Sequence, residues 1–266
     1  QSGNFGRIPV EQLLQRRQTQ RAPGGAYDRG TWTFQPASYA TQEHGAEEPV
    51  DDREATMYRD YFDAEMVSAQ RARDAVLRNL ELRIAGMLFN PVNFAPTNVA
   101  IKWDNSANAV PIDNVDAACK RVWAACGLWP NALIISRHVF LNLRRCAQLV
   151  DKIRFTRGGL PGEIGVTDLS LAFDLPYILV GGGATNVAAI GQAANIAAIW
   201  DDEYAMVARI CTTGDIREPG LGRTFHWSED GSSIGAAMES YRDETVRSNI
   251  IRARMDTDEV LLYPKA

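Results

Sequence analysis

Apolar residues near the middle of the chain recur with the period of a helix. Between positions 57 and 90 they stand mostly three or four residues apart, the spacing of one helix face. The stretch holds a single late glycine, Gly86, and it ends at Asn90-Pro91, where proline cannot continue a helix. At about 1.5 Å per residue this pattern predicts one helix roughly 50 Å long. Such a length favours a spine that lies across a sheet.

The sequence before this helix changes to alternation. Trp32 and Phe34 alternate with threonine and glutamine, as in a half-buried strand, and the acidic segment EHGAEEPVDD follows at 43–52. We therefore expect residues 31–56 to form a long β-hairpin, with an ordinary solvated loop as the alternative. Residues 1–30 are rich in Gln, Gly and Arg. They are expected to form an arm that gains order only by lying on a neighbouring surface.

Helices and strands alternate after a linker at 91–111. The expected elements are a helix over 112–126 ending at Gly127, a strand over 132–135, a helix over 137–153, a short helix over 169–173, a strand over 177–180 and one or two strands within 196–210. Beyond Pro219-Gly220 the pattern predicts strands over 224–227, within 234–251 and over 259–263, with a turn at Asp256-Thr257-Asp258. The sequence thus predicts an α+β protein.

Composition and charge argue against two classes of protein, membrane proteins and dedicated DNA-binding proteins. The 266 residues are 45% hydrophobic and 23% charged, which is typical of globular proteins. No apolar run approaches the roughly 20 residues that span a bilayer, so no membrane partner is expected. A net charge of −5 argues against a dedicated DNA-binding protein. Only four of the 28 basic residues are lysines, and the planar fork of arginine suits carboxylate pairing across interfaces.

Three glycines raise the possibility of a phosphate site. Gly181, Gly182 and Gly183 follow the strand expected at 177–180, but Ala184, Thr185 and Asn186 come next, so the third glycine of the dinucleotide fingerprint is missing at its place. The Walker pattern is absent from the sequence. We interpret the glycines as a tight turn with close backbone approach. An α/β nucleotide-binding enzyme that uses this turn is the alternative.

Other candidate chemistry has simpler interpretations. No G-x-S-x-G elbow surrounds Ser136-Arg137-His138, so Ser136 is expected to cap the following helix. The acids at 201–203 are expected to form a solvated turn, because three successive acids on a strand cannot all face one ion. The four cysteines and three histidines are scattered, which argues against a disulfide framework or a zinc site. We therefore expect no catalytic residue, no cofactor and no metal.

This organisation resembles the major capsid proteins of tailed bacteriophages, which have the Hong Kong 97-type fold. The resemblance runs from the hairpin at 31–56 to the C-terminus. It is carried by the arm, the acidic hairpin and the long helix ending at Asn90-Pro91, and then by PNALIIS at 130–136, LVDKIRFT at 149–156, YILVGGG at 177–183, AIWD at 198–201 and TFHW at 224–227.

The resemblance implies a domain plan and a function. The plan has an N-terminal arm at 1–30, an extended loop at 31–56, a peripheral domain with a spine helix over a β-sheet at 57–111 and 215–266, and an α/β axial domain at 112–214. The implied function is structural and non-catalytic. Copies would self-assemble as pentamers and hexamers into an icosahedral shell around double-stranded DNA, held without sequence specificity. The resemblance also implies that the protein assembles in the bacterial host cytoplasm and becomes part of the virion. The implied partners are a portal, a maturation protease and a decoration protein. Cleavage by that protease would explain the start at Gln1.

Contacts between subunits are expected on the arm and the hairpin. The candidates are Trp32, Phe34, Tyr39, Glu43, Glu47, Glu48, Asp51, Asp52, Arg16 and Arg17. We expect the carboxylates to face arginines of a neighbour. Residues 31–56 contain no lysine, so the lysine–asparagine cross-links that some relatives form from this loop are not expected. An encapsulin-type bacterial compartment is the alternative with the same fold, and a gene-transfer-agent or defective prophage shell is a further possibility.

Overall fold

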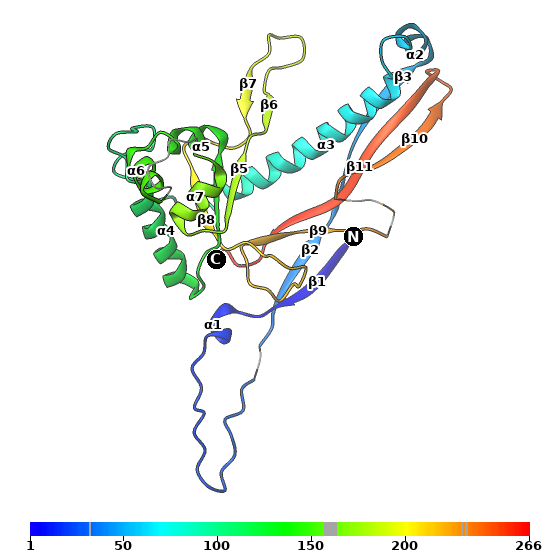
Figure 1. Ribbon diagram of the computed structural model, residues 1–266. Helices are drawn as coiled ribbons and strands as arrows, with labels where there is room; N and C mark the ends of the chain where they lie inside the picture. Colours follow the sequence, from blue (N-terminus) through cyan, green and yellow to red (C-terminus); the bar gives the residue numbers. More distant parts are fainter. Residues whose placement is uncertain (32, 157–163, 230, 232–233) are drawn as a thin grey trace.

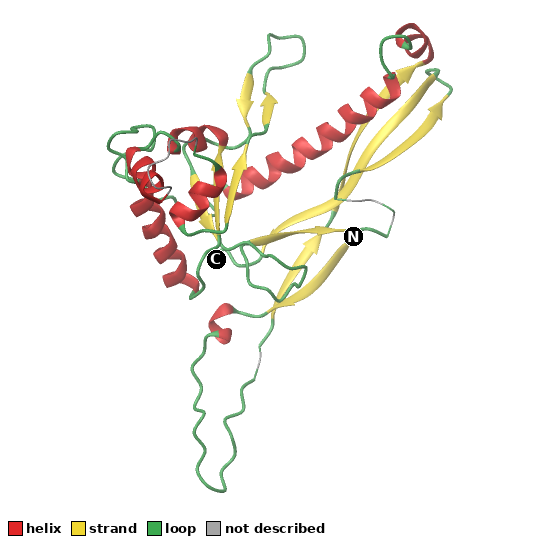
Figure 2. Ribbon diagram, viewed as in Figure 1, coloured by secondary structure: helices red, strands yellow, loops and turns green. Residues whose placement is uncertain are grey.

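The computed structural model describes residues 1–31, 33–156, 164–229, 231 and 234–266. The chain forms a helix-rich half and an elongated half in which a long helix runs along a sheet (Figures 1 and 2). A loop at the N-terminal end and a short hairpin project away from both halves (Figure 1).

The elongated half is built on the longest strand. β11 (Ser248–Leu261) pairs antiparallel with β3 (Gln42–Asp51), β10 (Ala237–Asp243) and β9 (Gly222–His226). The helix α3 (Ala64–Leu88) lies along β3 and β11 (Figure 1). The sheet therefore joins residues near the beginning of the chain to residues near its end.

A small buried cluster lies between α3 and this sheet. The buried cluster consists of Ala72, Val76, Ala236, Ala253 and Met255. Three of these residues are alanines, each of which contributes little apolar area. Hydrophobic burial inside this half is therefore limited.

The helix-rich half surrounds a three-stranded sheet. β4 (Ala132–Ser136) lies at its centre, parallel to β5 (Tyr177–Gly181) and antiparallel to β8 (Ala205–Ala208). All five residues of β4 are buried, as expected for a strand covered on both faces. The helices of this half are α4 (Pro111–Cys126), α5 (Arg137–Leu143), α6 (Ala147–Thr156) and α7 (Val166–Phe173).

A large apolar core fills the helix-rich half. Its fully buried members include Leu133, Ile135, Leu143, Leu149 and Leu169. Burying one such side chain contributes about 1.5–3 kcal/mol. The α4 helix ends at Gly127 in the left-handed conformation, with φ of 72°, which confirms the predicted glycine cap.

The N-terminal residues lie on the chain's own C-terminal end. β1 (Ser2–Arg7) pairs with β2 (Gln35–Ala40), and the short helix α1 (Val10–Leu13) follows β1. Val10 is buried in a cluster with Leu262, Tyr263 and Ala266. The first part of the expected arm is thus ordered by its own chain, and residues 14–31, here called the projecting loop, extend beyond it (Figure 1).

The expected hairpin over 31–56 is wrong. β2 and β3 follow each other along the chain but bind different partners, because β2 pairs with β1 and β3 pairs with β11. The charges explain the choice of partner for β3. Glu47 of β3 is paired with Arg252 of β11, and Asp52, the residue directly after β3, is paired with Arg242 of β10, each about two hundred residues away in the sequence.

Two expected helices are interrupted. The one expected over 57–90 begins earlier as α2 (Asp52–Tyr58), breaks, and resumes as α3 after Asp63. The side chain of Asp63 accepts hydrogen bonds from the amides of Glu65 and Met66, which starts a new helix there. The helix expected over 137–153 is likewise divided into α5 and α6. At the start of α6 the Ala147 amide donates a hydrogen bond to the carbonyl of Ser106, a tertiary contact that the local sequence does not show.

The turn expected at Asp256-Thr257-Asp258 is also wrong. β11 continues through these residues, and Asp256 and Thr257 are buried.

The helix-rich half contains a hairpin that was not predicted from the sequence. There β6 (Ala184–Asn186) pairs with β7 (Ile196–Ala198) and projects away from the helices (Figure 1).

Candidate subunit interface

Ion pairs bind β3 and the first residue of α2 to the neighbouring strands of the sheet. The carboxylate of Glu47 accepts a hydrogen bond from Arg252, with Nη2 2.6 Å from Oε1. Asp52 is bound by both terminal nitrogens of Arg242, at 2.6 and 2.7 Å. Two-point binding of this kind is the strongest arrangement of an arginine and a carboxylate. The arginines expected from a neighbour are therefore supplied in part by the same chain.

The other acidic residues proposed as subunit contacts also lie against parts of their own chain. Glu48 lies 3.5 Å from Arg71 of α3. The side chain of Asp51 caps α2 by accepting a hydrogen bond from the Arg53 amide, and Glu43 stands opposite Asp256 in the strand register. These positions form a charged edge along β3 rather than a free acidic patch.

A partly buried ion pair joins α3 to β11. Arg83 donates to both carboxylate oxygens of Glu259, at 2.9 and 3.1 Å, and also to the hydroxyl of Thr257. Burial alone would raise the pKa of Glu259, but the hydrogen bonds from Arg83 and Thr257 outweigh it and hold this pKa below its usual value. Burial, together with the Arg83 charge, lowers the pKa of the nearby His44.

The aromatic and basic candidates near the N-terminus separate into two groups. Tyr39 stacks on Phe225 of its own chain, with ring centroids 4.8 Å apart. Phe34 is 59% exposed, and Arg16 and Arg17 are exposed on the projecting loop. Trp32 lies outside the described residues.

Two of the three glycines, Gly181 and Gly183, form a close joint between the two halves of the chain. Trp200 Nε1 donates to Glu81 Oε1 of α3 at 2.6 Å. A Cβ atom on Gly181 would clash with the Trp200 ring, and one on Gly183 would lie 2.5 Å from the Glu81 carboxylate. The prediction of close backbone approach is therefore confirmed, and side-chain packing rather than a bound phosphate accounts for it.

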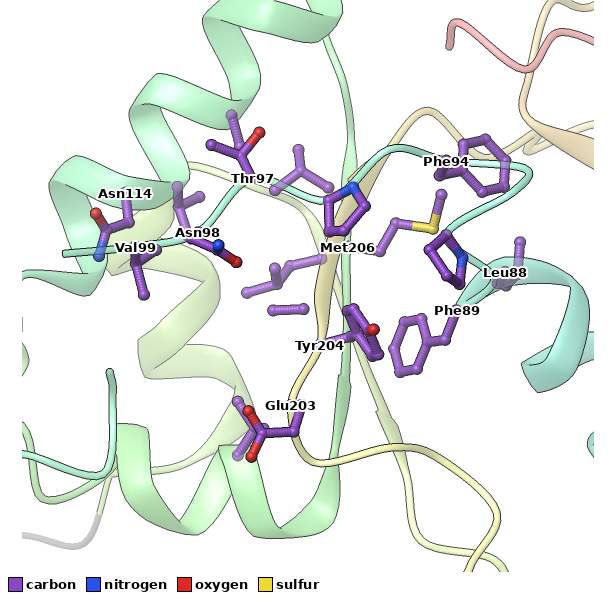
Figure 3. A pocket seen from close by; sticks show the side chains of 18 of the residues that line it. Leu88, Phe89, Phe94, Thr97, Asn98, Val99, Asn114, Glu203, Tyr204 and Met206 are labelled. Atoms are coloured by element: carbon purple, nitrogen blue, oxygen red, sulfur yellow. The ribbon is translucent and has the colours of Figure 1, made fainter. Parts of the chain in front are cut away.

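A cavity of about 1270 Å³ lies beside this joint. Its apolar lining includes Leu88 at the end of α3, Phe89 and Phe94 in the segment that follows, and Met206 of β8 (Figure 3). The glycines at 181–183 are not among the described residues that line it. The cavity therefore gives no support to a nucleotide site at the glycine turn.

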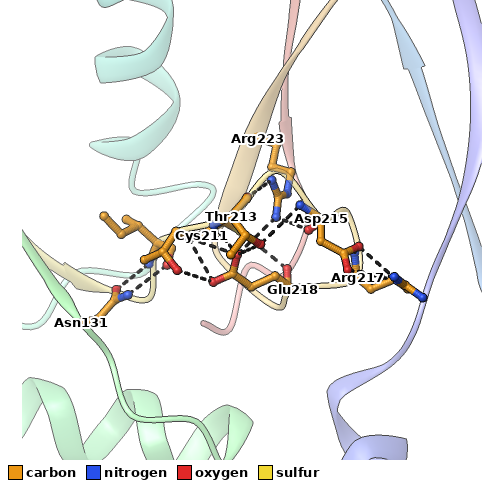
Figure 4. Close-up of polar contacts among 9 residues, drawn as sticks. Asn131, Cys211, Thr213, Asp215, Arg217, Glu218 and Arg223 are labelled. Carbon is orange, nitrogen blue, oxygen red and sulfur yellow. Dashed lines mark hydrogen bonds and ion pairs between the residues drawn. The ribbon is translucent and has the colours of Figure 1, made fainter.

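A tightly bonded loop connects β8 to β9. The Glu218 carboxylate accepts hydrogen bonds from the amides and hydroxyls of Thr212 and Thr213 (Figure 4). These bonds, the Thr212 amide first, lower the pKa of Glu218 to about 2. Arg223 donates to the carbonyls of Thr213 and Asp215. The loop is thus held in one shape at the surface, although its residue types indicate only turns.

Ser136, His138 and Asp202 meet without forming a catalytic triad. The hydroxyl of Ser136 accepts a hydrogen bond from the Val139 amide, which confirms the predicted helix cap. The same hydroxyl donates to Asp202 Oδ1 at 2.6 Å, and His138 Nδ1 lies 2.6 Å from the other carboxylate oxygen. Burial raises the pKa of Asp202, but these two hydrogen bonds bring it below its usual value. An activated serine would instead donate to the histidine.

The described residues show neither a metal-binding cluster nor a membrane-spanning helix. They contain no group of three or more His, Cys, Asp or Glu side chains placed to hold a metal ion. None of the helices in the described part of the chain combines the length and apolar character needed to cross a bilayer.

Known structures resemble this chain along nearly its whole length. A phage-related protein from Bordetella bronchiseptica matches 98% of the chain and 83% of its own, with a TM-score of 0.64 and 18% identity. The capsid structure of cyanophage P-SCSP1u matches 100% of this chain and 81% of its own, with a TM-score of 0.59 and 11% identity. The structure of a virus-like particle from Pyrococcus furiosus matches 100% of this chain and 84% of its own, with a TM-score of 0.58 and 11% identity.

The chain has the Hong Kong 97-type capsid fold. The helix that this fold places over a sheet is present as α3 on β3 and β11. Sequence similarity to a capsid protein is also detectable. The major capsid protein of Burkholderia phage BcepMu is 26% identical over 143 residues, which are 52% of this chain and 45% of that protein. The match thus spans less than half of that relative. No protein-family model matches the chain.

Proposed function

We propose that this protein is the major capsid protein of a tailed bacteriophage. Copies assemble as pentamers and hexamers into a closed icosahedral shell that encloses double-stranded DNA, and the protein is therefore part of the virion. The observation that carries the proposal is the extent of the structural match. It covers 98–100% of the chain, including the segments that project from the two halves.

The projecting segments support assembly on physical grounds. The projecting loop and the β6–β7 hairpin extend from the two halves of the fold (Figure 1), and the α3 half has only a small apolar core. Obligate interfaces commonly bury about 2,000–5,000 Å², which would cover such surfaces. We assign residues 112–214 to an axial domain and 57–111 with 215–266 to a peripheral domain, with Phe34, Arg16 and Arg17 in contact with neighbours.

The negative net charge of the chain is suited to a shell that must release its DNA. A strongly basic lining would bind phosphates tightly through counterion release and would hinder packaging and ejection. The net charge of −5 avoids this outcome. Contacts with the enclosed DNA are therefore weak and independent of base sequence.

Sedimentation of the native protein, with electron microscopy of the main peak after nuclease treatment, tests the proposal. Closed shells with nuclease-resistant DNA inside are the expected result. A monomer or small oligomer that persists across protein and salt concentrations would overturn it. Closed shells without DNA would instead favour an encapsulin-type compartment, a candidate supported by the likeness to the virus-like particle from Pyrococcus furiosus.

A further inference from the structure

The strand β8 forms an edge of the three-stranded sheet in the helix-rich half. It pairs with β4 on one side, and within the described part of the chain no strand pairs with its other side. Among the described residues, hydrogen bonds to the main chain of Ala205, Met206 and Val207 come only from β4. The sequence of β8, AMVA, contains none of the lysines and prolines that keep sheet edges from pairing with other chains. The outer edge of β8 is therefore open to a further strand.

This open edge faces the cavity beside the glycine joint (Figure 3). Ala205, Met206 and Val207 all line the cavity. Successive side chains of a strand point to opposite faces of a sheet, so a cavity lined by three consecutive residues lies along the edge of the strand. α4 packs beside β8, yet Ala205 is exposed and the next two residues are half-buried. The edge is thus accessible from the cavity.

The other walls of the cavity complete a groove. Residues 94–99 form one wall, and among the described residues the main chain of 95–99 makes no hydrogen bond. Ala118, Val122 and Ala125 form another wall, spaced along one face of α4.

The volume of this groove suits an extended segment. A strand rises about 3.3 Å per residue, with neighbouring strands about 4.8 Å apart and stacked layers about 10 Å apart, so one residue occupies roughly 160 Å³. The cavity of about 1270 Å³ can therefore hold roughly eight residues of extended chain.

The character of the lining favours a segment without charge. Most of the lining residues are apolar. Two pairs of charged side chains in the lining are bonded to each other. Lys102 Nζ lies 2.8 Å from Glu203 Oε2, and His138 Nδ1 lies 2.6 Å from Asp202 Oδ2. A charged segment would lose its hydration in this groove and gain little pairing in return.

We propose that this groove binds an extended, uncharged segment of a different protein, which pairs with β8 as a fourth strand of the sheet. In such strand addition, main-chain hydrogen bonds supply affinity and pockets for alternate side chains supply specificity. The inference goes beyond the proposed shell function and does not depend on it.

The described segments of this chain match the groove less well than a foreign segment does. The strands β6 and β7 are already paired with each other. The projecting loop of a second copy would bring its arginines into an apolar groove, namely Arg16, Arg17, Arg21 and Arg29. We therefore assign the groove to another protein rather than to a second copy.

Selection of peptides by the purified full-length chain tests this inference. A library of random peptides about ten residues long is expected to yield uncharged sequences rich in Val, Ile, Thr and aromatic residues, without proline at the centre. Ala205→Lys places a charge on the open edge and should weaken the binding of a selected synthetic peptide about tenfold or more. Ala198→Lys is the matched control and should leave the affinity unchanged, because Ala198 is an exposed alanine of β7 and is not among the described residues that line the cavity. Equal binding by the two variants, or a library that yields no binding peptide, would overturn the inference.

Modified peptides test whether the main chain carries the contact. Methylation of every second main-chain nitrogen removes the donors on one edge of a strand, so two such peptides probe the two edges separately. The peptide blocked on the edge that pairs with β8 should bind about tenfold more weakly or worse, with its side chains unchanged. Full binding by both methylated peptides would contradict strand addition.

A peptide of this chain's own residues 14–31 tests the source of the segment. Its four arginines should prevent it from binding the groove. Binding of this peptide that is lost in Ala205→Lys would overturn the assignment to another protein and would give the groove to a second copy.

Discussion

The two sheets of this molecule are stabilised in different ways. The sheet around β4 is enclosed by large aliphatic side chains such as Leu133 and Leu143. The sheet around β11 has a small core rich in alanine and is crossed by ion pairs such as Arg252–Glu47 and Arg83–Glu259. A buried leucine contributes about 1.5–3 kcal/mol, whereas an exposed ion pair contributes about 0.2–1 kcal/mol. The β4 half therefore depends mainly on its own burial, and the β11 half depends more on paired charges and, in our proposal, on neighbouring subunits.

The largest expected effect comes from opening the β4 core. Leu143→Ala should lower the free energy of unfolding by about 2–5 kcal/mol, because a fully buried leucine leaves a cavity. Leu171→Ala is the matched control, since Leu171 is 69% exposed on α7, and it should cost less than about 0.5 kcal/mol. Urea unfolding monitored by circular dichroism measures both. Equal losses for the two variants would contradict burial as the source of stability in this half.

The partly buried ion pair gives the next effect. Arg83→Met should cost about 1.5–3 kcal/mol, because the Glu259 carboxylate loses its charged hydrogen-bond donor. Arg217→Met, at an exposed pair with Asp215, should change stability by no more than about 1 kcal/mol. Unfolding of both variants in urea at pH 7 measures the difference.

The same pair predicts a pH dependence. The pKa of Glu259 is lowered in the folded chain, so its contribution is present above the unfolded value of about 4.3 and is lost as pH falls through the lower folded value. Arg83→Met should flatten the stability curve in that acidic range. A variant curve parallel to that of the unmodified chain below about pH 4 would contradict this assignment.

The joint between the halves is expected to be sensitive to a single methyl group. Gly181→Ala should cost about 1–3 kcal/mol, because the new Cβ would overlap the rigid Trp200 ring. Gly182→Ala is the matched control, since its Cβ would meet only the Arg137 side chain at an ordinary 4.0 Å. Thermal unfolding with tryptophan fluorescence distinguishes the two. A harmless Gly181→Ala would show that the joint tolerates movement of Trp200.

The smallest effect concerns the bonded loop before β9. The Glu218 carboxyl should titrate in NMR with a pKa of about 2, below its usual value because of the bonds from Thr212 and Thr213. A lowered pKa means that the carboxylate stabilises the folded loop above its ordinary pKa and stops doing so as pH falls toward about 2. Titration at the ordinary value for a glutamate would show that these bonds do not persist in solution.

The same contrast explains which parts of the fold were predictable from sequence. α4, β4 and β5 were predicted close to their observed bounds, because local apolar runs and caps specify them. The pairing of β3 with β11 depends on charges far apart in the sequence, and no local pattern shows it. Asp256 and Thr257 looked like a turn because their residue types favour turns, but burial within β11 overrides that preference.

The interface candidates were predictable only in part. The carboxylates at 43–52 were expected to face arginines of a neighbour, whereas Glu47 of β3 and Asp52 of α2 are bound by arginines of their own chain. Tyr39 is stacked on Phe225, a contact that sequence spacing cannot show.

A cryo-electron-microscopy reconstruction of the purified particle would test the central claim most directly. We predict a closed icosahedral shell in which the β4 half surrounds the five- and six-fold positions, with the charged β11 half lying between capsomers. A particle without icosahedral symmetry, or a discrete small oligomer as the only assembled form, would contradict the account.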